Sequence, residues 1–213
     1  MIDRCCMALL ALCMVSACQR TPPEPVSAST SQSSADMTSE PDVPATEVVV
    51  APVSETFRSR LALQGVQFEV RTVGNRLFVV PSGLEIANDP IERELAASAT
   101  DAEVADLDAD GSPELYVYLK DAGDPAKASL AAWASNRRKS LSEVTIDPLE
   151  NDPVLSAGYR GGDAFAVIEN RLARRFPLYA SDGTPTGKMR QIAYRLQPGE
   201  AGWRLVVDGS RED

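Results

Sequence analysis

The stretch from Val66 to Val80, VQFEVRTVGNRLFVV, decides the fold class of this chain. Apolar and polar side chains alternate from Val66 to Val70, and a period of two residues is typical of a β-strand with one buried face. Gly74 and Asn75 interrupt the alternation with residues that favour a turn, and a second apolar run follows them. The stretch therefore predicts two strands joined by a tight turn.

Strand-like segments of the same kind recur along the rest of the chain. One pair of them flanks a two-residue turn and a second pair flanks a longer loop, which is the pattern of two β-hairpins. The short spacing between strands predicts an all-β fold, an antiparallel β-sandwich or a barrel-like domain. The segments are 104–107, 115–119 (LYVYL), 164–169 paired with 172–179 across Asn170 and Arg171, and 191–196 paired with 203–207.

Two further segments fit more than one kind of secondary structure. Ile91 to Ala97 is compatible with a helical turn. Ala128 to Ser135, ASLAAWAS, fits a helix or a strand. We favour the strand because Trp133 lies between two expected strands.

The composition excludes several classes of function. Among 213 residues there is no histidine, so the usual general base, most zinc sites and every Ser-His or Cys-His nucleophile are absent. A net charge of -10 is unfavourable for binding nucleic acid, whose phosphates require clustered cations. No nucleotide-binding loop or nucleophile-elbow motif occurs. We therefore expect a binding protein, not an enzyme, with no nucleic-acid partner.

The N-terminus has the features of an export signal. The apolar stretch from Cys6 to Val15 is too short to span a bilayer but has the length of a signal-peptide core. It ends in Val15-Ser16-Ala17-Cys18, which resembles the lipobox of bacterial lipoproteins. This resemblance implies cleavage after residue 17 and lipidation of Cys18. Gln19 at the next position implies a lipid anchor in the outer membrane that faces the periplasm. The alternative is an ordinary secretory signal.

A linker is predicted to separate this signal from the folded domain. Residues 18–52 are rich in Pro, Ser, Thr and acidic residues and contain no aromatic side chain. Such a composition buries too little surface to offset the entropy of ordering. We expect a signal peptide at 1–17, the lipidated Cys18 and a disordered stalk at 18–52, and a β-rich domain at 53–213.

An acidic loop, DLDADGSPE at residues 106–114, is the sharpest local motif. Its first half has the spacing of an EF-hand calcium loop, but the twelfth position is Val117 instead of Glu. Oxygen ligands at alternate positions suit Ca²⁺, which is the possible cofactor. The alternative is a turn in which Asp side chains accept backbone N–H groups. The candidate metal ligands are Asp106, Asp108, Asp110 and Glu114.

Two short basic runs, 136–139 (NRRK) and Arg174-Arg175, are candidates for binding phosphate or an acidic partner. Most such runs are solvated turns or strand faces. The first also fits the turn of a β-hairpin, which is the interpretation we favour.

Four blocks of the chain together resemble the periplasmic inhibitors of invertebrate-type lysozyme. They occur in the same order with similar gaps, between about Ala105 and Val207. The resemblance implies an antiparallel β-sandwich that binds a secreted lysozyme and blocks its active-site cleft with a loop. The blocks are 106–123 (DLDADGSPELYVYLKDAG), 129–144 (SLAAWASNRRKSLSEV), 158–179 (GYRGGDAFAVIENRLARRFPLY) and 190–208 (RQIAYRLQPGEAGWRLVVD).

The loop that this resemblance makes functional is Asp121 to Ser129, which follows the LYVYL strand. It departs from the small polar residues and aromatic residue of the family pattern. If Lys127 and Asp124 face solvent at an exposed tip, Lys127 can pair with a catalytic carboxylate of the enzyme. If the loop folds back against the sheet, the alternative function is favoured instead. The alternative is an envelope-maintenance lipoprotein on the same fold, with or without bound calcium, that has no inhibitory activity. The candidate partner-binding residues are Asp121, Gly123, Asp124, Lys127 and Ser129.

Overall fold

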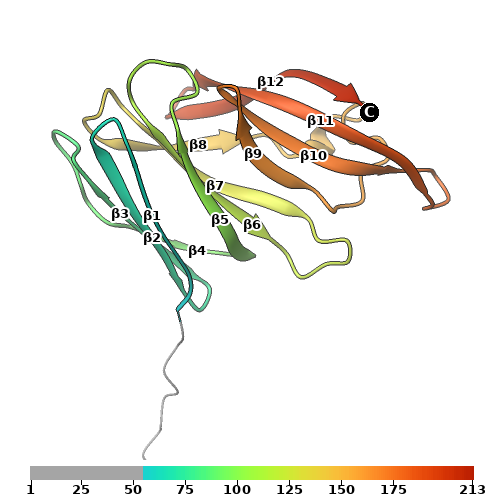
Figure 1. Ribbon diagram of the computed structural model, residues 1–213, viewed down its shortest axis with the longest axis horizontal. Helices are drawn as coiled ribbons and strands as arrows, with labels where there is room; N and C mark the ends of the chain where they lie inside the picture. Colours follow the sequence, from blue (N-terminus) through green and yellow to red (C-terminus); the bar gives the residue numbers. More distant parts are fainter. Residues whose placement is uncertain (1–54) are drawn as a thin grey trace, which may run out of the picture. The chain divides into compact units, whose positions relative to one another are not determined.

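Twelve β-strands and one short 3-10 helix account for the regular structure of residues 55–213, which are the residues described by this computed structural model (Figure 1). The expected all-β fold is confirmed, because no α-helix occurs in this range. The expected signal peptide, the Cys18 lipidation site and the linker lie outside the described residues. No helix between residues 55 and 213 is long and apolar enough to cross a membrane.

The first four strands form an antiparallel sheet in the order β1-β2-β3-β4. The predicted hairpin is confirmed: Val70 of β2 lies opposite Val79 of β3, and Gly74 in the turn has a left-handed φ of 59°. The helical turn expected near Ile91 is wrong. That segment is β4, which pairs with the outer edge of β3 and satisfies its backbone groups. The strands are β1 Glu55–Leu63, β2 Val66–Val73, β3 Arg76–Ser82 and β4 Ile91–Glu94.

The other eight strands form a second, mixed sheet in the order β5-β6-β7-β8-β12-β11-β10-β9. Every neighbouring pair is antiparallel except β8 and β12, which run parallel, so the expected antiparallel pattern holds for all but one pair. The strand expected at 128–135 is confirmed as β7. The strands are β5 Ser98–Ala105, β6 Glu114–Lys120, β7 Ala128–Ser135, β8 Leu141–Ile146, β9 Ala164–Ile168, β10 Arg171–Tyr179, β11 Pro185–Pro198 and β12 Trp203–Glu212, with the 3-10 helix η1 at Leu149–Asn151.

This second sheet curls until its two edge strands approach each other, which gives a barrel-like form (Figure 1). The Glu103 side chain of β5 bridges the seam, because its Oε2 accepts a hydrogen bond from the Val167 backbone N of β9 at 2.7 Å. The Tyr118 hydroxyl donates to the same oxygen. A carboxylate thus takes the place of a backbone partner that the seam lacks.

Strand β6 lies between two hydrophobic cores, which explains its uninterrupted apolar sequence. Leu115 and Val117 face a core shared with the four-stranded sheet, whereas Tyr116 and Tyr118 face the inside of the curled sheet. Both faces of the strand are therefore removed from water, and alternation with polar residues is lost. Complete burial of a side chain such as Leu115 contributes about 1.5–3 kcal/mol.

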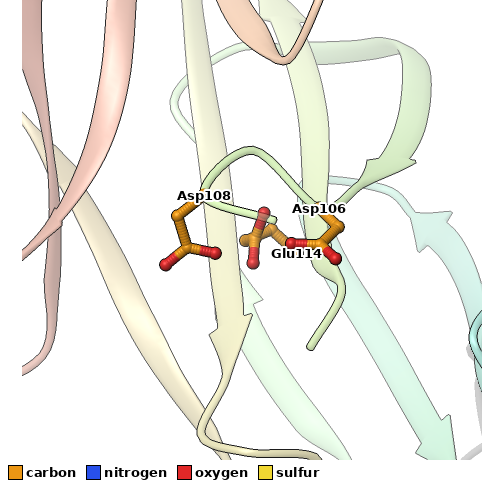
Figure 2. A group of neighbouring side chains, drawn as sticks. All are labelled: Asp106, Asp108 and Glu114. Carbon is orange, nitrogen blue, oxygen red and sulfur yellow. The ribbon is translucent and has the colours of Figure 1, made fainter. Parts of the chain in front are cut away.

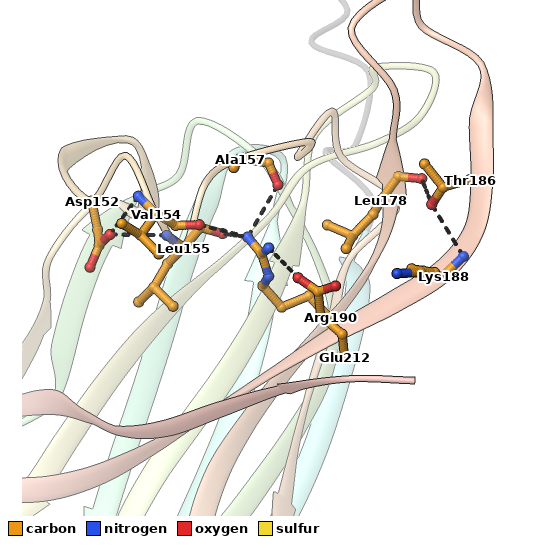
Figure 3. Close-up of polar contacts among 9 residues, drawn as sticks. All are labelled: Asp152, Val154, Leu155, Ala157, Leu178, Thr186, Lys188, Arg190 and Glu212. Carbon is orange, nitrogen blue, oxygen red and sulfur yellow. Dashed lines mark hydrogen bonds and ion pairs between the residues drawn. The ribbon is translucent and has the colours of Figure 1, made fainter.

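Arg190 on β11 holds the segment between η1 and β9 in place (Figure 3). Its Nη1 donates to three backbone carbonyl oxygens, those of Val154 at 2.9 Å, Leu155 at 2.6 Å and Ala157 at 3.1 Å. Its Nη2 donates to Glu212 Oε1 at 2.5 Å, near the end of β12. A single guanidinium therefore ties one irregular segment to two strands of the sheet.

Candidate functional site

The two regions that the sequence singled out lie at opposite ends of β6. The acidic loop at 106–114 leads into the strand, and the loop at 121–129, hereafter the partner loop, follows it. Seven residues of extended chain separate the loops by roughly 20 Å. They are therefore two distinct sites.

The acidic loop brings together three of its four candidate metal ligands (Figure 2). One carboxylate oxygen from each of Asp106, Asp108 and Glu114 lies within 4.8 Å of the others. Asp110 points elsewhere, because its Oδ1 accepts a hydrogen bond from the Ser112 backbone N at 2.7 Å. The structure thus provides three converging oxygen ligands, about half of the six to eight that Ca²⁺ takes.

The same loop also forms the turn that was the alternative to a metal site. Asp106 Oδ1 accepts the Asp110 backbone N, and Asp106 Oδ2 accepts the Gly111 backbone N, both at 3.0 Å. Gly111 has a left-handed φ of 82°, which suits glycine. From the β1–β2 turn, Gln64 Nε2 donates to Asp106 Oδ2 at 2.6 Å. A cation at this site would have to share Asp106 with these donors.

Glu114 is an unusual acidic residue because it is almost completely buried, with 2% of its surface exposed. Burial raises its pKa to about 8, and the charges of Asp108 and Asp106 add to this, although a hydrogen bond from the Leu107 backbone N opposes it. Burial, together with the charge of Asp110, also raises the pKa of Asp108. The loop therefore concentrates carboxyl groups that form no ion pair with a cationic side chain of residues 55–213, which favours their protonated forms.

The partner loop is closed on itself by Asp121. The Asp121 backbone N donates to the Lys127 carbonyl at 3.1 Å. In return, Asp121 Oδ1 accepts the backbone N–H groups of Lys127 at 2.7 Å and Gly123 at 3.0 Å. These two hydrogen bonds lower the pKa of Asp121. Three hydrogen bonds of Asp121 therefore hold the base of the loop in one conformation.

The charged residues of the partner loop point in different directions. Asp124 is exposed at the tip and makes no ion pair with any residue of 55–213. Lys127 turns back toward the body of the domain, where its Nζ lies 3.6 Å from Glu150 Oε1 and 5.8 Å from the centre of the Tyr159 ring. Ser129 is exposed at the start of β7. Asp124, and not Lys127, is thus the charge at the free tip.

The returning half of the partner loop packs against residues 159–163. The Gly162 backbone N donates to the Ala126 carbonyl at 2.7 Å. At Gly161, with a φ of 111°, a Cβ atom would lie 2.5 Å from the Pro125 carbonyl oxygen, so only glycine fits this approach. The loop therefore exposes Asp124 at its tip, while the half that leads to Lys127 is anchored against the domain, so each of the two alternatives describes one half of the loop.

A buried polar network supports this anchor, and no motif in the sequence pointed to it. Arg174 Nε donates to Asp163 Oδ2 at 2.6 Å, and Arg174 Nη2 donates to the Tyr159 hydroxyl at 2.9 Å. Asp163 Oδ1 accepts the Ala128 backbone N at 2.8 Å. Burial acts to lower the pKa of Arg174, but the Asp163 carboxylate together with Tyr159 and Tyr194 outweighs it and raises that pKa. The one feature of the sequence that could have indicated this network is the position of Arg174 in β10. It lies two residues before Phe176 and therefore points to the same, buried side of the strand.

A groove with a volume of about 530 Å³ runs beside the partner loop. Its walls include Asp121, Lys127 and Ser129 from the loop side, and Glu150 from η1 on the other. The Arg174 side chain and the Tyr159 ring lie along it. The groove therefore combines an acidic rim, an aromatic surface and a paired arginine.

The basic run at 136–139 is a hairpin turn, as favoured from the sequence. Arg137 and Arg138 have left-handed φ values of 52° and 55° between β7 and β8. Of the second run, Arg174 is buried, and Arg175 pairs with Asp213 on the surface. The second run therefore does not form a continuous basic patch.

Comparison with known proteins adds nothing to this geometry, since no family model, no curated protein and no solved structure matches the chain.

Proposed function

We propose that this domain is a binding protein that inhibits an invertebrate-type lysozyme by inserting the tip of the partner loop into the enzyme's active-site cleft. The observation that carries the proposal is the form of that loop. Its base is closed by three hydrogen bonds between Asp121 and the chain from Gly123 to Lys127, while the tip at Asp124 is exposed. A loop already held in one conformation loses less entropy when it binds.

The charges of the chain support a protein partner of opposite sign. The net charge is -10, and Asp124 presents at the tip a carboxylate that forms no ion pair with any of residues 55–213. Complementary charge speeds association and excludes partners of the same sign. The absence of histidine from the sequence favours a binding role over catalysis. We propose further that Cys18 carries a lipid anchor in the outer membrane, which rests on the sequence alone.

A lytic assay tests the inhibitor function. The full chain with Cys18→Ser, which prevents lipidation, is titrated against invertebrate-, chicken- and goose-type lysozymes while clearance of a cell suspension is followed. We expect selective inhibition of the invertebrate type and a loss of about tenfold or more in inhibition for Asp124→Ala. Asp89→Ala, which removes the same charge from another exposed loop, is the control. Absence of inhibition of all three enzymes at micromolar protein contradicts the proposal.

A second candidate function is favoured by the acidic loop. Convergence of Asp106, Asp108 and Glu114 within 4.8 Å suits a calcium-dependent structural lipoprotein of the envelope without inhibitory activity. The two candidates differ in which end of β6 binds, so substitutions at one end leave the other unaffected.

A further inference from the structure

We propose that the groove beside the partner loop binds a basic side chain of a partner protein, and that Lys127 fills this cation slot when no partner is bound. The inference deepens the proposed function, because it names the chemistry of the partner surface next to the inserted tip. It rests on the groove and on the position of one ammonium group. The cation slot is the space that the Lys127 ammonium occupies, and it is lined by Glu150, Tyr159, Asp121 and Asp147.

The position of the Lys127 ammonium shows that the slot suits a cation. Nζ lies 3.6 Å from Glu150 Oε1 and 5.8 Å from the centre of the Tyr159 ring. A carboxylate beside an aromatic face is the combination that attracts ammonium and guanidinium groups. The same two groups would attract the lysine or arginine of another protein that reached this point.

The charge balance of the groove leaves it attractive to a cation. Three carboxylates line it, those of Asp121, Asp147 and Glu150. The Arg174 guanidinium is the group that would repel a cation, but it is neutralised by Asp163, whose side chain is fully buried. Asp147 is shared with Arg204 at 2.9 Å. Removal of the Lys127 ammonium would therefore leave the rim with an excess of negative charge.

The walls of the groove suit the rest of a basic side chain. Leu130, Ile146 and Pro148 contribute apolar surface along which the methylene groups of lysine or arginine can lie. The volume of about 530 Å³ is within the range of small ligand sites. The charged group of such a side chain would therefore contact carboxylates, and its methylene groups would contact apolar residues.

Lys127 can leave the slot at little cost. Its side chain is 53% exposed, and that of Glu150 is 58% exposed. An ion pair between two such groups shifts an equilibrium by no more than about fivefold. The backbone N–H of Lys127, and not its ammonium, holds the loop through Asp121. An incoming cation can therefore replace the ammonium without opening the loop.

The test uses amino-acid amides as probes and the full chain with Cys18→Ser. Nα-acetyl-arginine amide and Nα-acetyl-lysine amide are titrated while the NMR resonances of Tyr159 and Ala128 are followed; Nα-acetyl-glutamine amide is the neutral probe. We expect both cationic probes to shift these resonances and the neutral probe to leave them unchanged. Lys127→Ala removes the internal competitor and should tighten binding by about two- to fivefold. Glu150→Gln should weaken it.

Lys139→Ala is the matched control, because it removes one positive charge from the turn at the other end of β7. It should leave probe affinity unchanged. Equal tightening by Lys139→Ala and Lys127→Ala would mean that net charge alone governs binding, which overturns the slot. Absence of shifts for both cationic probes in the wild type and in Lys127→Ala also overturns it. Probe binding without lysozyme inhibition would support the cation slot and contradict the proposal of a lysozyme partner. Lysozyme inhibition without probe binding would support the lysozyme partner and contradict the cation slot.

Discussion

Asp163 and Arg174 form a buried ion pair in which Nε and Nη2 of the arginine each lie 2.6 Å from Asp163 Oδ2. The Asp163 side chain is fully buried, and that of Arg174 is 8% exposed. The pair lies under the partner loop, because the other oxygen of Asp163 accepts the Ala128 backbone N. It therefore links the interior of the curled sheet to the candidate binding surface.

Removal of one partner from this pair should destabilise the domain strongly. Arg174→Met leaves the Asp163 carboxylate buried without its cation, for which we expect a loss of about 3–5 kcal/mol in the free energy of unfolding by urea. The neighbouring Arg175 pairs with Asp213 on the surface, where both side chains are about half exposed. Arg175→Met should therefore cost less than about 1 kcal/mol. Similar losses for the two variants would show that the buried pair has no special role.

The pKa of Glu114 should make stability depend on pH. Its folded-state pKa is about 8 against an ordinary value of 4.5, so the folded state binds the extra proton between these pH values. Stability then falls as pH rises from 4.5 to 8, by at most about 1.4 kcal/mol per pH unit from this residue. Glu114→Gln should remove this part of the slope and be relatively more stable at pH 8. Urea unfolding at several pH values measures it, with the exposed Glu85→Gln as control; a wild-type slope retained in Glu114→Gln would contradict the assignment.

Calcium should stabilise the domain through Asp106, Asp108 and Glu114 but not through Asp110. We expect millimolar Ca²⁺ to raise the Tm of the wild type, more at pH 8 than at pH 6, because Glu114 must lose its proton to bind. Asp108→Asn should abolish most of this rise. Asp110→Asn should keep it, since an Asn Oδ1 still accepts the Ser112 N–H. A calcium effect that is absent, or lost equally in both variants, rejects the metal site.

Arg190 should control the local stability of residues 152–158. Arg190→Lys retains the charge but cannot reach three carbonyls and Glu212 together, so we expect faster amide hydrogen exchange at Leu155 and Ser156. The global free energy of unfolding should fall by about 1.5–3 kcal/mol, the range for a hydrogen bond to a charged group. Arg211→Lys, at an exposed arginine bonded to Gln191, should change neither quantity. Unchanged exchange at residues 152–158 in Arg190→Lys would contradict this role.

Most strands were predictable because the information for a strand is local. Alternation at Val66–Val70 and turn residues such as Gly74 depend only on neighbouring side chains, and they specified the β2–β3 hairpin correctly. The β4 strand was missed because it is an exposed edge strand of four residues, IERE, with almost no apolar signal. The parallel pairing of β8 with β12 joins residues about sixty positions apart and has no local signature.

For the candidate sites too, the sequence indicated the segments, and tertiary packing determined which of their side chains meet. Spacing in the sequence identified the acidic loop, and the resemblance to lysozyme inhibitors pointed to the partner loop. Each loop is one continuous segment, the first before LYVYL and the second after it. Tertiary packing determined which of their groups meet: Gln64 contacts Asp106, Asp110 turns away, and Lys127 lies against Glu150. It also created the network of Asp163 and Arg174. The physical reason is that periodicity and turn chemistry act over a few residues, whereas burial, ion pairing and pKa shifts depend on side chains that only the folded sheet brings together.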